Sequence, residues 1–193
     1  MKKVVLDDIL GLAAYEKARE EFRRRIIDLK RDRRVSVGDK VSLVFENRDT
    51  VIFQIQEMLR AEKITDLDKI REEIEVYNGL IPNAGELSAT LFLEIEDQGR
   101  LREELLRFLG VDETVFFNVG EHSIHARFEP GHAKEDKISA VQYVRFAFDA
   151  KAIRALSGGE GERAELAIDH PNYKARAPIG ANTRKALIGD LAA

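Results

Sequence analysis

Apolar residues near the start of the chain recur three or four positions apart, which is the spacing of one face of an α-helix. The pattern predicts helix over residues 6–34, with a break at Gly11 and a cap at Asp7 or Asp8. The same spacing predicts a second helix over residues 50–62 and a third from about residue 65 to residue 77. The apolar face of the first helix consists of Leu12, Tyr15, Ala18, Phe22, Ile26 and Leu29.

The second half of the chain changes to alternation, in which every second residue is apolar. Residues 87–95 have five apolar positions on one side, which predicts a strand with one buried face. Residues 35–46 predict a strand pair or one bent strand, with a turn signal at Gly38 and Asp39. Further strands are predicted at 114–119, 122–128, 138–148, 163–169 and 173–178, and short helices at 99–109, 150–156 and 181–191.

Helices that come first, followed mostly by strands with short links, favour the α+β class over a parallel fold of alternating strands and helices. We expect a largely antiparallel, curved sheet of about five or six strands. The N-terminal helices should pack on one of its faces. We expect residues 1–193 to form one domain, with a helix-rich half over residues 1–84 and a strand-rich half over residues 85–193.

Composition adds two constraints to this picture. The 193 residues include no cysteine, which excludes thiolate catalysis, a cysteine-ligated iron–sulfur cluster and a thiolate zinc site. Two lysines begin the chain, but Asp7 and Asp8 follow too soon for the apolar core of a signal peptide. No stretch approaches 18 apolar residues, so we expect a cytoplasmic protein without a membrane span.

The charge is unevenly distributed along the chain. Nine basic and five acidic residues between residues 16 and 34 give a net charge of +4, while the total is -4 and the remainder is therefore -8. This cationic helix could be a solvated helix with pairs four residues apart, or a surface that binds a protein. Nucleic acid is disfavoured, because acids are interleaved and Tyr15 and Phe22 lie on the apolar face. Self-association stays open.

Histidines are the first candidates for chemistry: His122, His125, His132 and His170. His122 and His125 are three positions apart, which suits a metal on a helix. Their neighbours favour a strand or hairpin, where this spacing points the two rings to opposite faces. Ordinary surface histidines are one reading and a metal site built on His122 or His125 is the other. Glu57, Glu62 and Glu121 could supply carboxylates to such a mixed site.

The predicted second helix carries the next candidates. Gln54, Glu57 and Arg60 are three residues apart and share a side of the helix. Such polar residues on a mostly apolar helix indicate either hydrogen bonds to a neighbouring strand or turn, or a ligand site. Near the C-terminus, Asp169 and His170 form an acid–histidine pair, but Pro171 and Asn172 are typical of a tight turn.

Five segments carry a family resemblance. They are residues 41–50 (VSLVFENRDT), 54–60 (QIQEMLR), 77–82 (YNGLIP) and 139–146 (SAVQYVRF), followed by Asp169, His170, Pro171 and Tyr173. In order and spacing they resemble an uncharacterised bacterial family, domain of unknown function (DUF) 3501. The segments span nearly the whole chain, and the second of them lies on the helix that holds Gln54, Glu57 and Arg60.

The resemblance implies a setting rather than an activity. Members of that family look to be encoded beside rubrerythrin-like proteins and iron–sulfur oxidoreductases, which implies a role near redox or peroxide defence. The chain has neither cysteine nor a Glu-x-x-His helix pair for a di-iron site. We therefore expect an accessory or interaction protein with such a partner. The alternative is a small-molecule-binding or metal-dependent enzyme with a pocket beside the Gln54–Arg60 helix.

Overall fold

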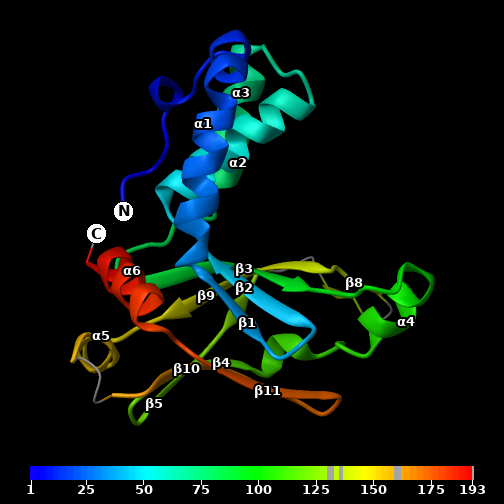
Figure 1. The fold of residues 1–193 in the computed structure, drawn as a ribbon, viewed down its shortest axis with the longest axis vertical. Coiled ribbons are helices and arrows are strands. Elements are labelled where there is room, and N and C mark those ends of the chain that lie inside the picture. Colours follow the sequence, from blue (N-terminus) through cyan, green and yellow to red (C-terminus); the bar gives the residue numbers. More distant parts are fainter. Residues whose placement is uncertain (130–132, 135–136, 159–161, 193) are drawn as a thin grey trace.

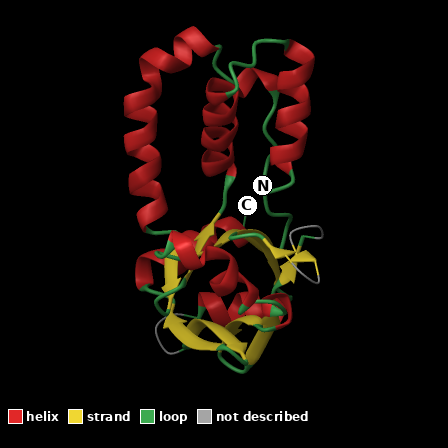
Figure 2. Ribbon diagram, turned by 90° about the vertical axis from the view of Figure 1, so that its right-hand side faces the viewer, coloured by secondary structure: helices red, strands yellow, loops and turns green. Residues whose placement is uncertain are grey.

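The structure, a computed structural model, describes residues 1–129, 133–134, 137–158 and 162–192. It has two parts, a helical arm and a body that contains all the strands (Figure 1). The helical arm consists of the N-terminal segment and α1 (Leu12–Arg31), α2 (Arg48–Ala61) and α3 (Leu67–Asn78). These three helices stand side by side above the strands in Figure 2. His132 lies outside the described residues.

The helical arm has a hydrophobic core of its own. α2 lies between the other two helices and packs against both. Its start is fixed by Asn47, whose side chain accepts the amide hydrogen of Thr50. Asp66 caps α3 in the same way. The buried residues of the arm core are Val4, Val51, Ile52, Ile55, Leu59, Ile74, Leu80 and Ile81.

The body contains two antiparallel sheets and a small hairpin. The first sheet has the order β1-β2-β3-β9-β6 and the second has the order β11-β10-β4-β5. The strands of the first sheet are β1 (Arg34–Val37), β2 (Val41–Phe45), β3 (Glu86–Leu93), β6 (Arg127–Phe128) and β9 (Val141–Ala147). Those of the second are β4 (Val115–Val119), β5 (His122–His125), β10 (Ala164–His170) and β11 (Tyr173–Pro178), and β7 (Ala133–Lys134) pairs with β8 (Lys137–Ile138).

The main core lies between the two sheets. Alternate residues of β3 point into it, as the sequence pattern predicts, and Leu87 and Leu91 are at most 1% exposed. Four phenylalanine rings join the layers at centroid distances of 5.1–6.3 Å: Phe45, Phe117, Phe146 and Phe148. Short helices close the edges: α4 (Leu101–Leu106), α5 (Ala150–Ser157), α6 (Ala181–Leu191) and the 3-10 turns at Gln98–Arg100 and Val111–Glu113. A further 3-10 turn, Leu6–Asp8, belongs to the arm.

The structure confirms the α+β class, the antiparallel pairing and the N-terminal helices, and it divides the strands differently. The run expected as one strand at 122–128 consists of two. His122–His125 pairs with β4 in the second sheet, whereas Arg127–Phe128 pairs with β9 in the first. Buried Ala126 lies between them, where the chain passes from one sheet to the other. The strands therefore stack as two sheets instead of forming one.

The arm lies on the side of the first sheet that faces away from the second sheet, and it stands up from that sheet rather than lying flat on it. Its base is held by an ion pair between Arg33 and Asp190 of α6, with nitrogen–oxygen distances of 2.6 and 3.0 Å. The first helix begins at Leu12, after the expected break at Gly11, and ends at Arg31 because Arg34 starts β1. Among the described residues, no helix is both long and apolar enough to cross a membrane.

Candidate functional site

The joint between arm and body is built around the buried carboxylate of Glu46, which is 2% exposed. Its Oε2 accepts hydrogen bonds from the Thr50 hydroxyl at 2.5 Å and from the Gln54 amide at 2.9 Å. Its Oε1 accepts from the Thr90 hydroxyl at 2.6 Å. All three donors are neutral, so this buried acid is held by hydrogen bonds that tie α2 to β3. Gln54 is one of these ties.

Glu57, the second candidate on α2, turns toward α1. Its two carboxylate oxygens accept two hydrogen bonds from Arg19, each 2.8 Å long, and one from the Tyr15 hydroxyl at 2.8 Å. Hydrogen bonds from Arg19 hold the pKa of the Glu57 carboxyl below its usual value, with the Tyr15 hydroxyl adding to the effect. Burial and the hydrogen bond to Glu57 raise the pKa of Tyr15. The contact fastens α1 to α2.

Arg60 turns to a third partner, since its Nε donates to Glu16 at 2.7 Å on the exposed side of the arm. Gln54, Glu57 and Arg60 are thus close along one helix, but their side chains reach three different neighbours. Gln56 between them is fully buried and bonds the backbone of Leu10 in both directions, at 2.7 and 3.1 Å. The polar residues of α2 connect the arm internally and to the body.

A cavity of about 300 Å³, which we call the joint cavity, lies beside α2 on another side. Burial, followed by the charge of Glu46, raises the pKa of Tyr143, and burial, followed by Tyr143 and Glu73, raises the pKa of Tyr77. Three of the five segments that carry the resemblance contribute to its lining. The lining residues are Met58, Glu73, Val76, Tyr77, Leu80, Glu129 and Tyr143.

The two candidate histidines lie on β5, at the edge of the second sheet, and line one cavity of about 450 Å³ with Asp149. The His125 ring packs on Phe116 at a centroid distance of 5.1 Å. The pKa of Asp149 is lowered mainly by the amide hydrogen of Ala152, and the nearby His122 contributes. Within the described residues, no three His, Cys, Asp or Glu side chains are grouped so as to hold a metal ion.

His170 has a structural environment. It is 3% exposed in the β10–β11 hairpin, and its Nε2 lies 2.8 Å from the Leu109 carbonyl. Its Nδ1 accepts the amide hydrogen of Asn172 at 3.2 Å. These two contacts need a neutral ring with hydrogen on Nε2. Asp169 instead pairs with Lys174 at 2.6 Å, so the acid–histidine pair is separated and the turn interpretation is confirmed.

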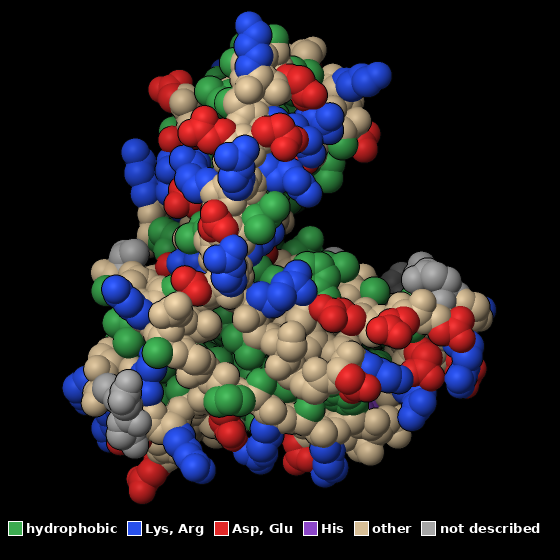
Figure 3. All heavy atoms as spheres, in the orientation of Figure 1, with side chains coloured by type: hydrophobic (Ala, Val, Ile, Leu, Met, Phe, Trp, Pro, Cys, Tyr) green, Lys and Arg blue, Asp and Glu red, His purple; other side chains and the backbone are tan. Residues whose placement is uncertain are grey.

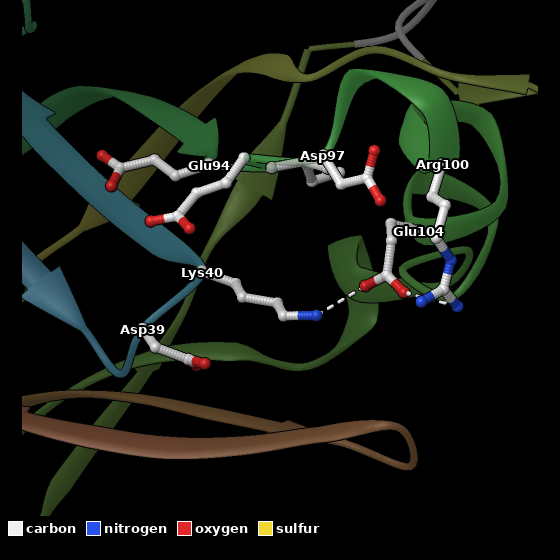
Figure 4. A pocket seen from close by; sticks show the side chains of 8 residues that line it. Asp39, Lys40, Glu94, Asp97, Arg100 and Glu104 are labelled. Atoms are coloured by element: carbon white, nitrogen blue, oxygen red, sulfur yellow. Dashed lines mark hydrogen bonds and ion pairs between the residues drawn. The ribbon is translucent and has the colours of Figure 1, made fainter.

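An acidic cleft of about 300 Å³ near α4 escaped the sequence analysis (Figure 4). Lys40 reaches across it to Glu104, with a nitrogen–oxygen distance of 2.5 Å, and this contact holds the pKa of Glu104 below its usual value. The only sequence signal for the cleft was the acidic run after β3. Its charged lining residues are Asp39, Lys40, Glu94, Glu96, Asp97, Arg100 and Glu104.

The surface of the helical arm is unusual in two respects. The large apolar residues that the structure leaves exposed are all in the arm: Val5, Leu10, Ile27, Leu67 and Val76, at 40% to 70% exposure. In addition, α1 carries seven basic and four acidic residues. In the described part of the chain, no carboxylate lies within 4.0 Å of Arg23 or Arg24. Basic side chains are spread over the arm in Figure 3, while acidic ones gather at the end of the body near α4.

Comparison with solved structures finds a protein with the same fold. That protein, of unknown function and from Burkholderia pseudomallei, has a crystal structure that matches this chain with a TM-score of 0.92 and 34% sequence identity. The match covers 98% of this chain and 100% of that chain. No curated protein matches. A family model described as "Protein of unknown function (DUF3501)" matches residues 3–191.

Proposed function

The chain belongs to the DUF3501 family, and we propose that it is a cytoplasmic accessory protein that binds a protein partner through its helical arm in a bacterial redox or peroxide-defence setting. The observation that carries the proposal is the placement of the exposed apolar residues, all of them on the arm. These side chains lie on the N-terminal segment, on α1 and on α3. Large apolar side chains that are left open to water in one part of a molecule are a feature of interaction surfaces. The arm stands free of the body on most sides, so a partner can reach it.

Charge supports the same surface and describes the partner. α1 has a net charge of +3 from seven basic and four acidic residues, and Arg23, Arg24 and Arg25 are exposed in succession. Even complete pairing within α1 would leave three basic residues over, and the ion pairs inside this helix are Arg19–Glu20 and Arg31–Asp28, neither of them four residues apart. The surface therefore suits an acidic partner, which the field would steer toward the arm.

The redox part of the proposal rests on the family resemblance. With no cysteine, the chain supplies no thiolate for an iron–sulfur cluster, so any such centre would belong to the partner. A rubrerythrin-like protein or an iron–sulfur oxidoreductase is the partner class we propose. The chain's part would be to bind and position that protein, because each candidate polar residue of α2 is occupied in contacts within the chain.

The experiment measures binding of purified rubrerythrin-like and iron–sulfur oxidoreductase proteins from the same organism by calorimetry at two salt concentrations. The variant Arg23→Glu/Arg24→Glu reverses two exposed charges on the arm. The matched control Lys151→Glu/Arg154→Glu reverses two exposed charges on α5 of the body. The arm variant should weaken binding by about tenfold or more, equivalent to about 1.4 kcal/mol, with the control unchanged.

Equal losses in both variants, or no binding by either class of protein, would contradict the proposal. The test also covers a second copy of the chain as the occupant. The acidic cleft has five acidic and two basic residues, so its net charge is opposite in sign to that of α1. Light scattering at low and high salt measures this. A dimer or larger assembly that Arg23→Glu/Arg24→Glu disperses would replace the hetero-partner with self-association.

A small-molecule-binding or metal-dependent enzyme is the second candidate function. It is favoured by the cavity that His122, His125 and Asp149 line together and by the joint cavity beside the helix of Gln54, Glu57 and Arg60. Elemental analysis of protein purified without a metal-binding tag tests the metal form. Stoichiometric metal that His122→Ala removes would establish it, and metal-free protein that stays unloaded after incubation with divalent ions would dismiss it.

A further inference from the structure

The described lining of the joint cavity combines an apolar surface with carboxylates and includes no basic side chain. Met58, Val76 and Leu80 supply its apolar wall, and two tyrosines supply aromatic rings. The ionisable side chains in the lining, apart from the tyrosines, are Glu73 and Glu129. No lysine, arginine or histidine is among the described residues that line it. The cavity is open to solvent at Val76, which is 70% exposed.

The negative charge around the joint cavity is only partly compensated. Glu129 lies 3.9 Å from Arg145, whose guanidinium also bonds Glu86 at 3.2 Å and the Gly79 carbonyl. In the described part of the chain, no basic group lies within 4.0 Å of the Glu73 carboxylate. The described donors to Glu46, beneath the joint, are all neutral and lie at 2.5–2.9 Å. Arg145 is thus shared among Glu86, Glu129 and a carbonyl, and Glu86 has a second partner in Arg127 at 3.2 Å. The described lining of the cavity itself carries two carboxylates and no basic side chain.

The tyrosines respond to this field. Burial is the first cause that raises their pKa values, and the charge of Glu73 adds to the effect at Tyr77, while the charges of Glu46 and Glu129 add to it at Tyr143. The ring face of a neutral phenol carries the partial negative charge that attracts cations. The carboxylates and the aromatic ring faces thus both attract a cationic ligand.

We propose that the joint cavity binds an alkylammonium group, with its hydrocarbon against Met58 and Leu80 and its charge between Glu73, Glu129 and the tyrosines. An anion would be repelled by both glutamates. A neutral hydrocarbon would take water away from these carboxylates and offer them no hydrogen bond or charge in return. A metal ion would need a set of ligands that the described residues do not gather. A volume of about 300 Å³ suits one small amine or one lysine side chain.

Tyrosine absorption offers a direct assay, because the chain has four tyrosines and no tryptophan, and two of the four line the cavity. Ultraviolet difference spectra are recorded while n-butylammonium, n-butanol or butyrate is titrated at constant ionic strength. We expect saturable binding of n-butylammonium, about tenfold tighter than that of n-butanol, and no binding of butyrate. Equal binding of the amine and the alcohol would overturn the proposal, as would no binding of the amine.

Variants locate the site within the molecule. Glu73→Gln/Glu129→Gln should remove the preference for n-butylammonium over n-butanol while thermal unfolding confirms that the fold is intact. Glu75→Gln is the matched control, because Glu75 is an exposed residue of the same helix outside the lining. An equal loss in Glu75→Gln would refute the site. A lysine derivative with both backbone ends blocked as amides distinguishes a lysine side chain from a free amine as the natural ligand. Tighter binding than that of n-butylammonium points to a protein side chain. Weaker binding points to a free amine.

The inference does not depend on a partner for the arm. A chain that binds n-butylammonium but neither redox protein would keep the joint cavity and lose the proposed function. A chain that binds its partner through Arg23 and Arg24 but ignores n-butylammonium would do the reverse. The two sets of measurements therefore fail separately.

Discussion

The ion pair between Arg33 and Asp190 is the contact whose loss should cost the most stability. It joins the base of the arm to α6 through two hydrogen bonds, and the two side chains are 5% and 6% exposed. The Arg33 Nε is buried and has no acceptor within the described residues. Replacing Asp190 with alanine would therefore leave a whole guanidinium charge in a site closed to water.

The expected loss follows from this burial. Removing one partner of a buried, hydrogen-bonded ion pair typically costs about 3–5 kcal/mol, because the other charge stays unpaired. In a chain of 193 residues, 1 kcal/mol corresponds to about 2–4 °C in the melting temperature. The variant Asp190→Ala should thus melt roughly 6–20 °C below the wild type.

Urea and thermal unfolding followed by far-ultraviolet circular dichroism measure the effect. Two controls separate charge from shape. Arg33→Met/Asp190→Leu removes both charges and should recover most of the lost stability, because no unpaired charge stays buried. Asp28→Ala breaks the pair with Arg31 on α1, whose side chains are 62% and 74% exposed, and should change stability by no more than about 0.5 kcal/mol.

Two results would refute the reasoning. If Asp190→Ala is no less stable than Asp28→Ala, then water reaches the guanidinium and the contact is a surface pair. If the double variant is as unstable as Asp190→Ala, then the cost comes from lost shape in α6 rather than from an unpaired charge on Arg33.

Two further predictions concern the arm and the hairpin of the second sheet. Because the Arg19 hydrogen bonds lower the pKa of Glu57, its ionised form stabilises the fold above its unperturbed pKa of 4.5, and this stability is lost as pH falls through the folded value. The free energy of unfolding, measured from about pH 7 to about pH 3, should therefore fall less steeply in Glu57→Gln than in the wild type. Parallel curves for the two proteins would contradict this. His170→Ala should lose about 1–3 kcal/mol in urea unfolding, because the Leu109 carbonyl loses its partner, and a loss below about 0.5 kcal/mol would show that water replaces the ring.

Local patterns predicted the elements well, because each depends on neighbours in sequence. The alternation at residues 87–95 gave β3, and Gly38 with Asp39 gave the turn between β1 and β2. Alternation says which side of a strand is buried, and it does not say what covers that side. All five residues of β2 are buried: Val41, Leu43 and Phe45 belong to the main core, and Ser42 and Val44 on the opposite face are buried as well. The division into two sheets was therefore hidden.

The candidate site shows the same limit. The sequence singled out Gln54, Glu57 and Arg60 correctly as polar residues on an apolar helix. Their partners come from distant positions, such as Arg19, 38 residues from Glu57. Nothing in the local pattern of α2 specifies which carboxylate or arginine will stand opposite. A ligand role for these three residues stays a prediction.

The helical arm and the body have separate hydrophobic cores and are connected by polar contacts. Because the arm core and the main core are distinct clusters, apolar packing alone does not fix one against the other. Three polar ties connect different parts of the arm to the body: Glu46 with α2, Arg33 with α6, and Arg145 with the Gly79 carbonyl after α3. The joint cavity takes its walls from both sides of this connection. If a group bound there and a partner on α1 favour the same arm angle, each ligand must tighten the binding of the other by an equal factor.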